Sequence, residues 1–467
     1  MAIGSLKEIE AAVKGHLVHD SHELSVLGVE FDSRQIQSGD LFIPLIAERD
    51  GHDFVESAFE AGAVCSLWQK DKDMSLAPNE MPLILVDDTQ QAMERLAEYY
   101  LHVTRPKVIA VTGSNGKTTT KDITAAICAQ KYKTHKTQGN FNNHIGVPKT
   151  IFDMPNDTEV LVVEMGMDRA GEIDHLARLV QPDIAIVTMI GESHIEFLGS
   201  REKIADAKME ILHGLKLDGL FIYPADEELI VDRLPESVKS ISFGLDEAAD
   251  VYATDIKSEV FSTEFKVNIY PGEQFVLNIP GSYNVKNALA ALIAGNELDI
   301  SGEQIAAALH AVQLTKNRLE WLKGKSNIWV LNDAYNASPT SMKAAIDYFQ
   351  STELKGRRIA VLGDILELGD FSQAMHRSIG EKINEDKLDA VYLYGPQMIA
   401  LNGYLMEHCP KLKVYYYPDS REELLNHLQA YIHSGDFILI KSSFGTGLRL
   451  LVDDLLTYQI ENGLDND

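Results

Sequence analysis

A short stretch of the chain, K-V-I-A-V-T-G-S-N-G-K-T-T-T-K, combines glycines, a lysine and hydroxyls at the spacing of a phosphate-binding loop. Gly113 and Gly116 allow the backbone to approach a phosphate chain, so that successive N–H groups point toward it. Lys117 is expected to reach the β and γ phosphates, and the hydroxyl of Thr118 is expected to ligate Mg²⁺. The spacing therefore predicts a nucleotide site.

The elements that position this loop are a strand before it and a helix after it. The β-branched run at 108–111 predicts a buried strand, and apolar residues at helical spacing predict a helix from Lys117 onward. The N-terminus of that helix adds its positive end to the phosphate site. The general pattern has another glycine where this chain has Val111, so the turn is a variant of that loop.

Three later residues are candidates to act on the bound nucleotide. Glu164 ends one strand-like run, His194 follows the next, and Lys208 lies in a helical segment. Ligands of open α/β sheets bind outside the carboxyl ends of the strands, where Glu164 and His194 are expected. Mg²⁺ takes oxygen ligands readily and nitrogen rarely, so His194 is expected to position groups unless a second cation binds.

Composition limits the classes of function. The chain has 467 residues, 45% of them hydrophobic, and a formal net charge of -28, which disfavours binding to nucleic acid or an anionic membrane. Cys65, Cys128 and Cys409 are widely separated, as expected of buried thiols in a reducing compartment. An N-terminal apolar region and a long apolar run are both lacking, so we expect a cytoplasmic protein without membrane insertion.

Length and periodicity predict an α/β protein of three domains. Residues 1–104 read as a small α/β module with a helix near Val55. Residues 105–314 read as a P-loop-type parallel sheet, with an antiparallel patch from Val251 to Pro280. Residues 315–467 alternate strands and helices as an open, Rossmann-like sheet without a nicotinamide fingerprint.

Several segments together resemble the Mur ligases of bacterial cell-wall synthesis. They are spread over all three predicted domains. Two of these segments, at 332–342 and 362–369, are most similar to the members of this family that add D-alanyl-D-alanine. The segments are the phosphate loop itself, G-N-F-N-N-H-I-G-V-P at 139–148, E-M-G at 164–166, G-E-S-H at 191–194, A-K-M-E-I at 207–211, Y-N-V-K-N-A at 283–288, N-R-L-E at 317–320, N-D-A-Y-N-A-S-P-T-S-M at 332–342 and L-G-D-I-L-E-L-G at 362–369.

The resemblance implies a role for each matching residue. The ATP phosphates would be held by Gly113, Ser114, Asn115, Gly116, Lys117, Thr118 and Thr119. Other nucleotide contacts would come from Asn287 on the adenine side, Arg318 near the γ-phosphate, and Asp333 and Asn336 from the third domain. The metal region would contain Thr118, Glu164, His194 and Lys208, the last matching a lysine that is carbamylated in several relatives. Substrate contacts would come from Ser33, Arg34, Asn140, Asn143 and Asp364.

The implied reaction is ATP-dependent amide formation in peptidoglycan precursor synthesis. The first domain would bind UDP-N-acetylmuramoyl-tripeptide, the second ATP with Mg²⁺, and the third D-alanyl-D-alanine. The tripeptide carboxylate would become an acyl phosphate, and attack by the dipeptide amine would release phosphate, with Lys117, Glu164, His194, Lys208 and Arg318 taking part. We also expect a monomer.

Other functions remain alternatives. A sibling ligase adding one amino acid, or a ligase like folylpolyglutamate synthetase, would share the phosphate loop. The segments at 332–342 and 362–369 argue against both. A GTPase switch is a further alternative, because D-R-A-G at 168–171 imitates its metal motif, but Asp386 stands where guanine recognition needs asparagine. A non-catalytic nucleotide-binding scaffold would leave Lys117 and Arg318 without a role.

Overall fold

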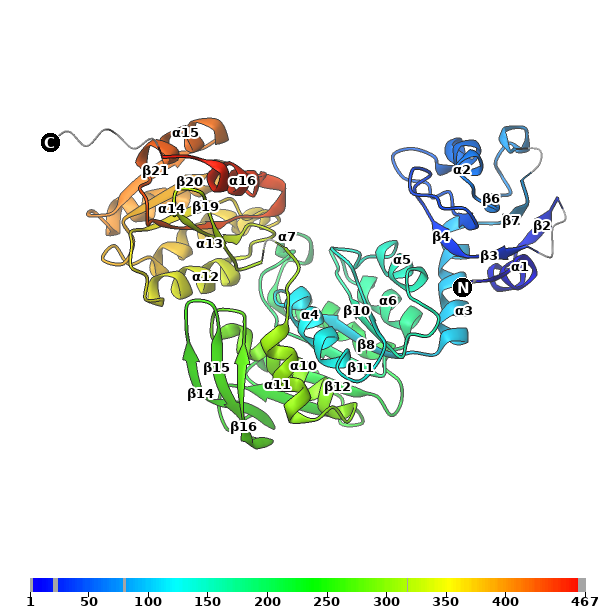
Figure 1. Ribbon diagram of the computed structural model, residues 1–467, viewed down its shortest axis with the longest axis horizontal. Helices are drawn as coiled ribbons and strands as arrows, with labels where there is room; N and C mark the ends of the chain where they lie inside the picture. Colours follow the sequence, from blue (N-terminus) through cyan, green and yellow to red (C-terminus); the bar gives the residue numbers. More distant parts are fainter. Residues whose placement is uncertain (1–2, 20–23, 79–80, 317, 461–467) are drawn as a thin grey trace.

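The computed structural model describes residues 3–19, 24–78, 81–316 and 318–460. Within these ranges the chain forms three main sheets, each with its own helices, and they follow one another along the sequence (Figure 1). The α/β class and the three-part arrangement predicted from the sequence are confirmed. Among the described residues, no helix combines the length and apolarity needed to cross a bilayer.

The first part is a five-stranded sheet in the order β2-β7-β6-β5-β4. Strands β4 to β7 run parallel, and β2 joins β7 antiparallel. A small pair, β1 and β3, lies apart from this sheet. The long helix α3 leaves this part and packs against α5 and α6 of the second part. The elements are β1 (Gly4–Ser5), α1 (Leu6–Val13), β2 (His16–Val18), β3 (Ser25–Val26), β4 (Gly28–Glu30), β5 (Asp40–Phe42), α2 (Val55–Glu60), β6 (Cys65–Gln69), β7 (Leu83–Val86) and α3 (Thr89–Thr104).

The second part is a nine-stranded sheet in the order β16-β15-β14-β13-β12-β11-β8-β10-β9. Strands β8 to β14 are parallel, whereas β14, β15 and β16 pair antiparallel, as the change of periodicity after Val251 predicted. The strands are β8 (Lys107–Thr112), β9 (Thr134–Lys136), β10 (Val160–Glu164), β11 (Ile184–Val187), β12 (Leu220–Pro224), β13 (Lys239–Gly244), β14 (Val251–Ser258), β15 (Thr263–Val267) and β16 (Tyr270–Leu277).

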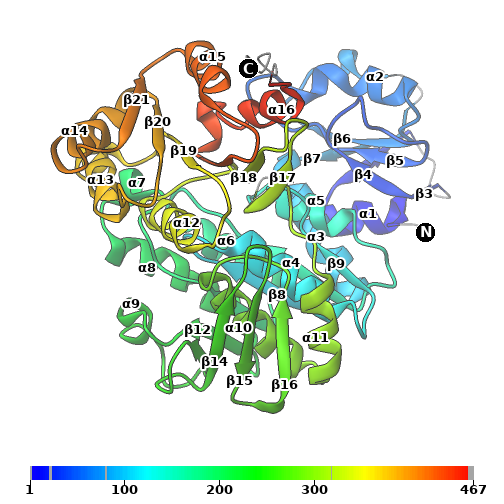
Figure 2. The same ribbon diagram turned by 60° about the vertical axis from the view of Figure 1, so that its left-hand side comes forward.

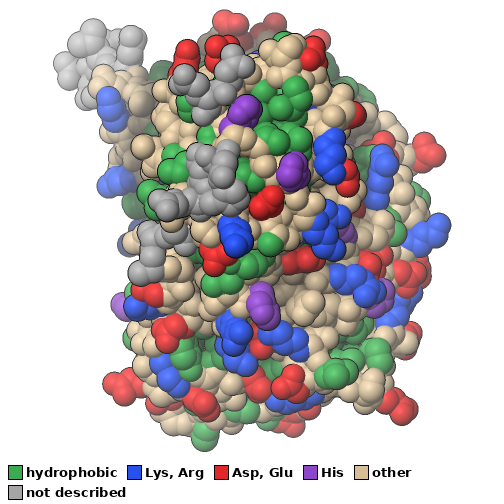
Figure 3. All heavy atoms as spheres, turned by 90° about the vertical axis from the view of Figure 1, so that its right-hand side faces the viewer, with side chains coloured by type: hydrophobic (Ala, Val, Ile, Leu, Met, Phe, Trp, Pro, Cys, Tyr) green, Lys and Arg blue, Asp and Glu red, His purple; other side chains and the backbone are tan. Residues whose placement is uncertain are grey.

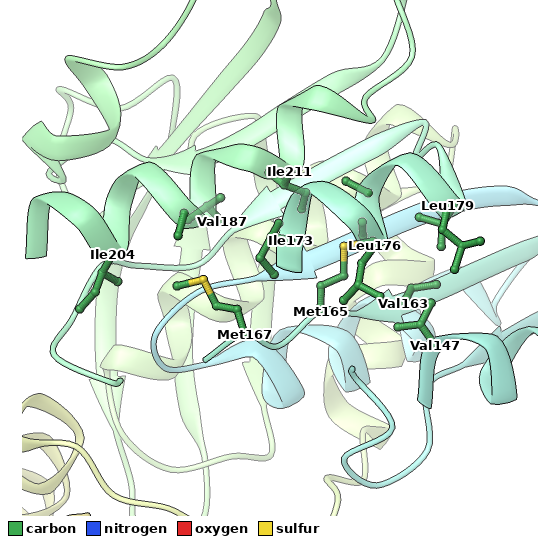
Figure 4. Packing of buried hydrophobic residues seen from close by; sticks show 14 of the residues in the cluster. Val147, Val163, Met165, Met167, Ile173, Leu176, Leu179, Val187, Ile204 and Ile211 are labelled. Atoms are coloured by element: carbon green, nitrogen blue, oxygen red, sulfur yellow. The ribbon is translucent and has the colours of Figure 1, made fainter. Parts of the chain in front are cut away.

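Eight α-helices accompany this sheet in the described part of the chain. Helix α4 follows the phosphate loop directly, as predicted, and packs against α10 and α11. Figure 4 shows the other face, where Met165 lies with Ile173 and Leu176 of α6 in a buried apolar layer. The helices are α4 (Lys117–Cys128), α5 (Gly146–Phe152), α6 (Glu172–Val180), α7 (Ile195–Leu198), α8 (Arg201–Met209), α9 (Glu228–Val231), α10 (Tyr283–Glu297) and α11 (Gly302–Ala311).

The third part is a six-stranded sheet in the order β17-β18-β22-β19-β20-β21. All pairs are parallel except β17 with β18, which confirms the open, mostly parallel sheet. Figure 2 shows this part beside the second one, with α7 and α12 between them. The elements are β17 (Glu320–Lys323), β18 (Trp329–Asp333), α12 (Pro339–Ser351), β19 (Arg358–Gly363), α13 (Ser372–Ile379), β20 (Ala390–Tyr394), α14 (Ile399–His408), β21 (Lys413–Tyr417), α15 (Arg421–Tyr431), β22 (Phe437–Lys441) and α16 (Leu450–Thr457).

Strand register brings the predicted functional residues to one edge of the central sheet. Glu164 pairs with Val111, and Val187 pairs with Thr112, so β10, β8 and β11 end at the same level. The phosphate loop and the segments after β10 and β11 therefore start from one line of the sheet.

The surface and the cysteines agree with the composition. On the face shown in Figure 3, basic and acidic side chains are interspersed. Cys65, Cys128 and Cys409 are buried and free, as predicted.

Candidate active site

The phosphate loop adopts a conformation that requires its two glycines. Gly113 and Gly116 have φ of +148° and +83°, a region that favours glycine. A Cβ at Gly113 would collide with the Thr188 hydroxyl, and one at Gly116 with the Asn287 amide. The loop backbone is therefore held close to β11 and α10, and Gly116 directly precedes the first turn of α4.

Lys117 folds back over the loop. Its Nζ donates to the carbonyl of Gly113 at 2.8 Å. Burial lowers the pKa of the Lys117 ammonium, the charge of Glu164 opposes that shift, and the charge of Arg318 adds to it. A backbone carbonyl of the phosphate loop therefore holds the Lys117 ammonium against that loop.

A cavity of about 450 Å³ opens above the loop, between the second and third parts of the chain. Its walls bring together most of the residues assigned to ATP from the sequence. These are Ser114, Asn115, Gly116, Lys117, Thr118, Thr119, Asn287, Arg318, Asp333 and Asn336.

Two cations in this cavity have no carboxylate within ion-pair distance among the described residues: Lys117 and Arg318. Arg318 stacks on Tyr335 at 4.3 Å, and its Nε is buried without a hydrogen-bond partner in the described structure. By contrast, Lys441 is paired with Asp333. A buried, unsatisfied guanidinium NH opposite a phosphate loop fits an anionic ligand.

Glu164 has the features of a ligand for a hard cation. It is 2% exposed, and Asn142 donates to its Oε1 at 2.9 Å. Its Oε2 is buried and has no hydrogen-bond partner among the described residues. An orphaned carboxylate oxygen suits the oxygen coordination that Mg²⁺ prefers, and the buried Thr118 of the phosphate loop offers a hydroxyl, so these residue types fit that ion.

A buried ion pair, Lys121 with Asp122, lies beside Glu164. The Nζ of Lys121 lies 3.4 Å from Asp122 Oδ1 and 3.8 Å from Glu164 Oε2, and all three side chains are almost fully buried. Asp122 also accepts from Lys136 at 2.7 Å, and from the backbone N–H and hydroxyl of Thr315 at 2.8 and 2.9 Å. The pair therefore connects Glu164 with the segment that leads to Arg318.

Lys208 is 1% exposed near the end of α8. Burial lowers the pKa of its ammonium well below the ordinary value, and the charge of Lys117 lowers it further. Both effects shift Lys208 in the direction of the neutral amine, the form that reacts with CO₂.

Comparison with known proteins agrees with this geometry. The family models described as the Mur ligase catalytic domain, middle domain and glutamate ligase domain match residues 25–101, 111–295 and 317–444. The UDP-N-acetylmuramoyl-tripeptide–D-alanyl-D-alanine ligase of Bacillus subtilis is 44% identical, over 97% of this chain and 98% of the relative. The chain belongs to the Mur ligase family.

Solved structures of Mur ligases extend the likeness to the fold. A MurF crystal structure from Acinetobacter baumannii has a TM-score of 0.87 and 31% identity, covering 97% of this chain and 98% of that one. MurF ligase from Thermotoga maritima in complex with ADP has a TM-score of 0.79 and 27% identity, covering 91% and 96%.

In this Mur ligase, His194 faces the third part of the chain. Its Nδ1 lies 2.7 Å from Glu367 and 3.2 Å from Asp168, and the imidazole lowers the pKa of the Glu367 carboxyl. These three side chains also form a group that could hold a metal ion. His194 therefore links the second part of the chain to Glu367 of the third part.

Two further hydrogen bonds join the second and third parts of the chain. The hydroxyl of Thr340 donates to Glu192 at 2.7 Å, and that of Ser338 donates to Asn115 at 3.1 Å. Ser338 is the N-cap of α12, so the start of this helix is fixed against the phosphate loop.

The residues predicted to contact substrate lie apart from the cavity above the loop. Arg34 is exposed and pairs with Asp32 at 2.6 Å, close to Ser33. Asn143 lines a second cavity, between α3 and the central sheet, and Asn140 lies in the same loop. Asp364 is buried and accepts from the backbone of Gln397 and Met398 at 3.2 and 3.0 Å, so it organises the loop after β19.

Several site residues of this Mur ligase were missed from the sequence. Lys121 follows Lys117 by one helical turn, a spacing that was available as a signal. Lys441 ends β22 in register with Asp333, the last residue of β18. Asn142 gave no signal of its own, because its role depends on meeting Glu164. The N-R-L-E segment begins at Asn317, which lies outside the described residues.

Proposed function

We propose that this Mur ligase joins D-alanyl-D-alanine to UDP-N-acetylmuramoyl-tripeptide and converts ATP to ADP and phosphate. The name of its 44% identical relative supports this substrate pair. The observation that carries the proposal is the cavity in which Lys117 and Arg318 face each other from two parts of the chain, both without a carboxylate partner among the described residues.

The proposed division of labour follows the three sheets. Residues 1–104 bind the UDP-muramoyl end, residues 105–314 bind ATP, and residues 315–467 bind the dipeptide. The phosphate loop at the carboxyl edge of the central sheet supports the second assignment. The ADP complex of the Thermotoga maritima relative supports ATP as the nucleotide.

The proposed chemistry develops negative charge on oxygen at each step. Transfer of the γ-phosphoryl group to the tripeptide carboxylate gives an acyl phosphate, and attack by the dipeptide amine gives a tetrahedral intermediate, the amide and phosphate. Lys117 and Arg318 stabilise these charges. Thr118 and Glu164 would hold Mg²⁺, which supplies further positive charge to the phosphates when bound.

Exclusion of water is the proposed task of the contacts between the second and third parts. An acyl phosphate hydrolyses in water, so the site has to be covered before it forms. Ser338, Thr340 and Glu367 already contact the central part at the rim of the site, which supports this role.

We propose that Lys208 acts as a carbamate. Its amine is shifted toward the neutral form by burial and would react with CO₂ to give a carbamate and a released proton, and the carbamate would offer oxygen to a hard cation beside Lys117. Lys208→Ala should be nearly inactive, and a small added carboxylic acid should restore part of the rate. Because a carbamate loses CO₂ in acid, the mass is measured under native conditions at neutral pH, where it should show one CO₂ on the native protein and none on the variant. A near-normal rate in Lys208→Ala would remove this residue from the mechanism.

The proposed function is tested by ADP release from purified protein. UDP-N-acetylmuramoyl tripeptide is crossed with D-alanyl-D-alanine, single amino acids and glutamate, each with ATP or GTP. Release should require ATP, tripeptide and D-alanyl-D-alanine together. Strong turnover with one amino acid would favour a sibling ligase, and turnover with GTP alone would contradict the proposal.

The cellular setting is also a proposal. We propose that the protein acts as a monomer. Three buried free thiols, with ATP and a UDP-sugar as substrates, support the cytoplasm.

A further inference from the structure

The second cavity lies between the first and second parts of the chain. It has a volume of about 630 Å³ and is bounded by the start of α3 on one side and by α6 with the loop after β10 on the other. Figures 1 and 2 both show α3 beside α5 and α6. We call this cavity the α3–α6 groove.

The α3–α6 groove reaches the reaction centre. Asn142 lines it, and the same side chain donates to Glu164 at 2.9 Å. Asp168 lines it as well and lies 3.2 Å from His194. Under the proposed function, the peptide runs from the first part of the chain to Glu164. The third residue, whose carboxylate is activated, then lies at this end of the groove.

The groove is lined by acidic side chains. Asp88, Glu94, Asp168 and Glu172 line it, whereas neither lysine nor arginine occurs among its described lining residues. Glu94 pairs with His175 at 3.0 Å, and Asp168 pairs with His194.

The other two carboxylates have backbone partners. Asp88 accepts from the N–H of Gln91 at 2.8 Å, and Glu172 accepts from the N–H of Asp168 at 2.7 Å. Their negative charges are therefore not balanced by a fixed cation in the described structure, and a substrate amine can face them.

We infer that the third residue of the peptide substrate ends in an amine without an added carboxylate, as L-lysine does. This inference rests on the proposed function and specifies its substrate. An ammonium beside Asp88 and Glu172 is attracted, whereas the extra carboxylate of diaminopimelate would place a like charge among these acids. The groove opens to solvent, so the effect is moderate and sensitive to salt.

The test compares two UDP-N-acetylmuramoyl tripeptides, one ending in L-lysine and one in meso-diaminopimelate, with ATP and D-alanyl-D-alanine. We expect kcat/KM to be about tenfold higher with the lysine substrate, as for one like-charge contact avoided. This ratio should fall as salt is raised. Equal rates, or a preference for diaminopimelate, would overturn the inference. Failure of both substrates would instead overturn the proposed function.

A double variant locates the effect in the groove. Asp88→Asn keeps an N-cap side chain, and Glu172→Gln keeps an oxygen for the backbone N–H groups. In this variant the ratio should fall toward one, while Glu303→Gln, at an exposed position on α11, should keep the native ratio. Calorimetric binding of the two tripeptides without ATP gives the same comparison if the variant turns over poorly. An unchanged ratio of affinities in the double variant would overturn the assignment to these carboxylates.

Discussion

Asp122→Asn is the most informative perturbation of the buried charges behind the phosphate loop. Asparagine keeps an oxygen that can accept from the Thr315 N–H, but it removes the negative charge beside Lys121. Lys136 is partly exposed and can turn to water, whereas Lys121 is 0% exposed and cannot. Breaking a buried pair by removing one partner costs about 3–5 kcal/mol in the free energy of unfolding.

Burial already lowers the pKa of the Lys121 ammonium, and the charge of Asp122 opposes that shift. Loss of this carboxylate therefore favours the neutral amine, which places the expected cost at the lower end, about 3 kcal/mol. The double variant Lys121→Met/Asp122→Asn removes both charges of the pair and should recover part of that loss, because replacing a buried pair is often neutral but Glu164 then loses a neighbouring cation.

Hydrogen–deuterium exchange of peptides from β8 and α4 is the suitable assay, because a protein with three sheets need not unfold in one step. The three tryptophans, Trp68, Trp321 and Trp329, lie outside the central sheet, so their fluorescence would report other regions. Equal protection in Asp122→Asn and the double variant, within about 1 kcal/mol, would refute the coupling between Lys121 and Asp122.

Three further predictions concern the loop, the division of the chain and the third sheet. Lys117→Ala should lower kcat by roughly 10²–10³, as for loss of one electrostatic donor, and a rate above a tenth of native in the ADP assay would contradict its role. A protein ending at residue 314 should bind UDP-N-acetylmuramoyl tripeptide by calorimetry without turnover, and a folded truncation that fails to bind would disprove the proposed domain roles. Burial lowers the pKa of His376, whose Nε2 accepts from the N–H of Ile365 at 3.0 Å. The unfolded chain therefore binds a proton at His376 more readily than the folded chain does. Thermal stability of the third part should fall as pH drops below about 6.5, and His376→Gln should show a smaller fall.

The local pattern of apolar residues was sufficient to predict the strands around the phosphate loop. Continuous apolar, β-branched runs predicted β8, β10 and β11, and the change to an alternating pattern after Val251 predicted the antiparallel strands. These features depend on neighbours in the sequence, so periodicity reveals them. Gly113 and Gly116 could be recognised for the same reason, since their conformations belong to one turn.

Only the tertiary structure decided which side chains meet. Asn142 holds Glu164 across 22 residues, and Asp122 reaches Thr315 across 193. Such pairs arise because parallel strands end at one edge and bring distant segments together, and neither residue carries a local signal of its partner.

The meeting of distant segments also explains the acidic lining of the α3–α6 groove. Asp88 and Glu94 belong to a helix of the first part, whereas Asp168 and Glu172 follow a strand of the second. In the sequence these are ordinary surface acids, and their charges act together only because α3 packs against α6. The sequence alone therefore determined the class of chemistry, through the phosphate loop. The packing of the first part on the second decided which charges surround the peptide, because electrostatic interaction depends on distance in space and not along the chain.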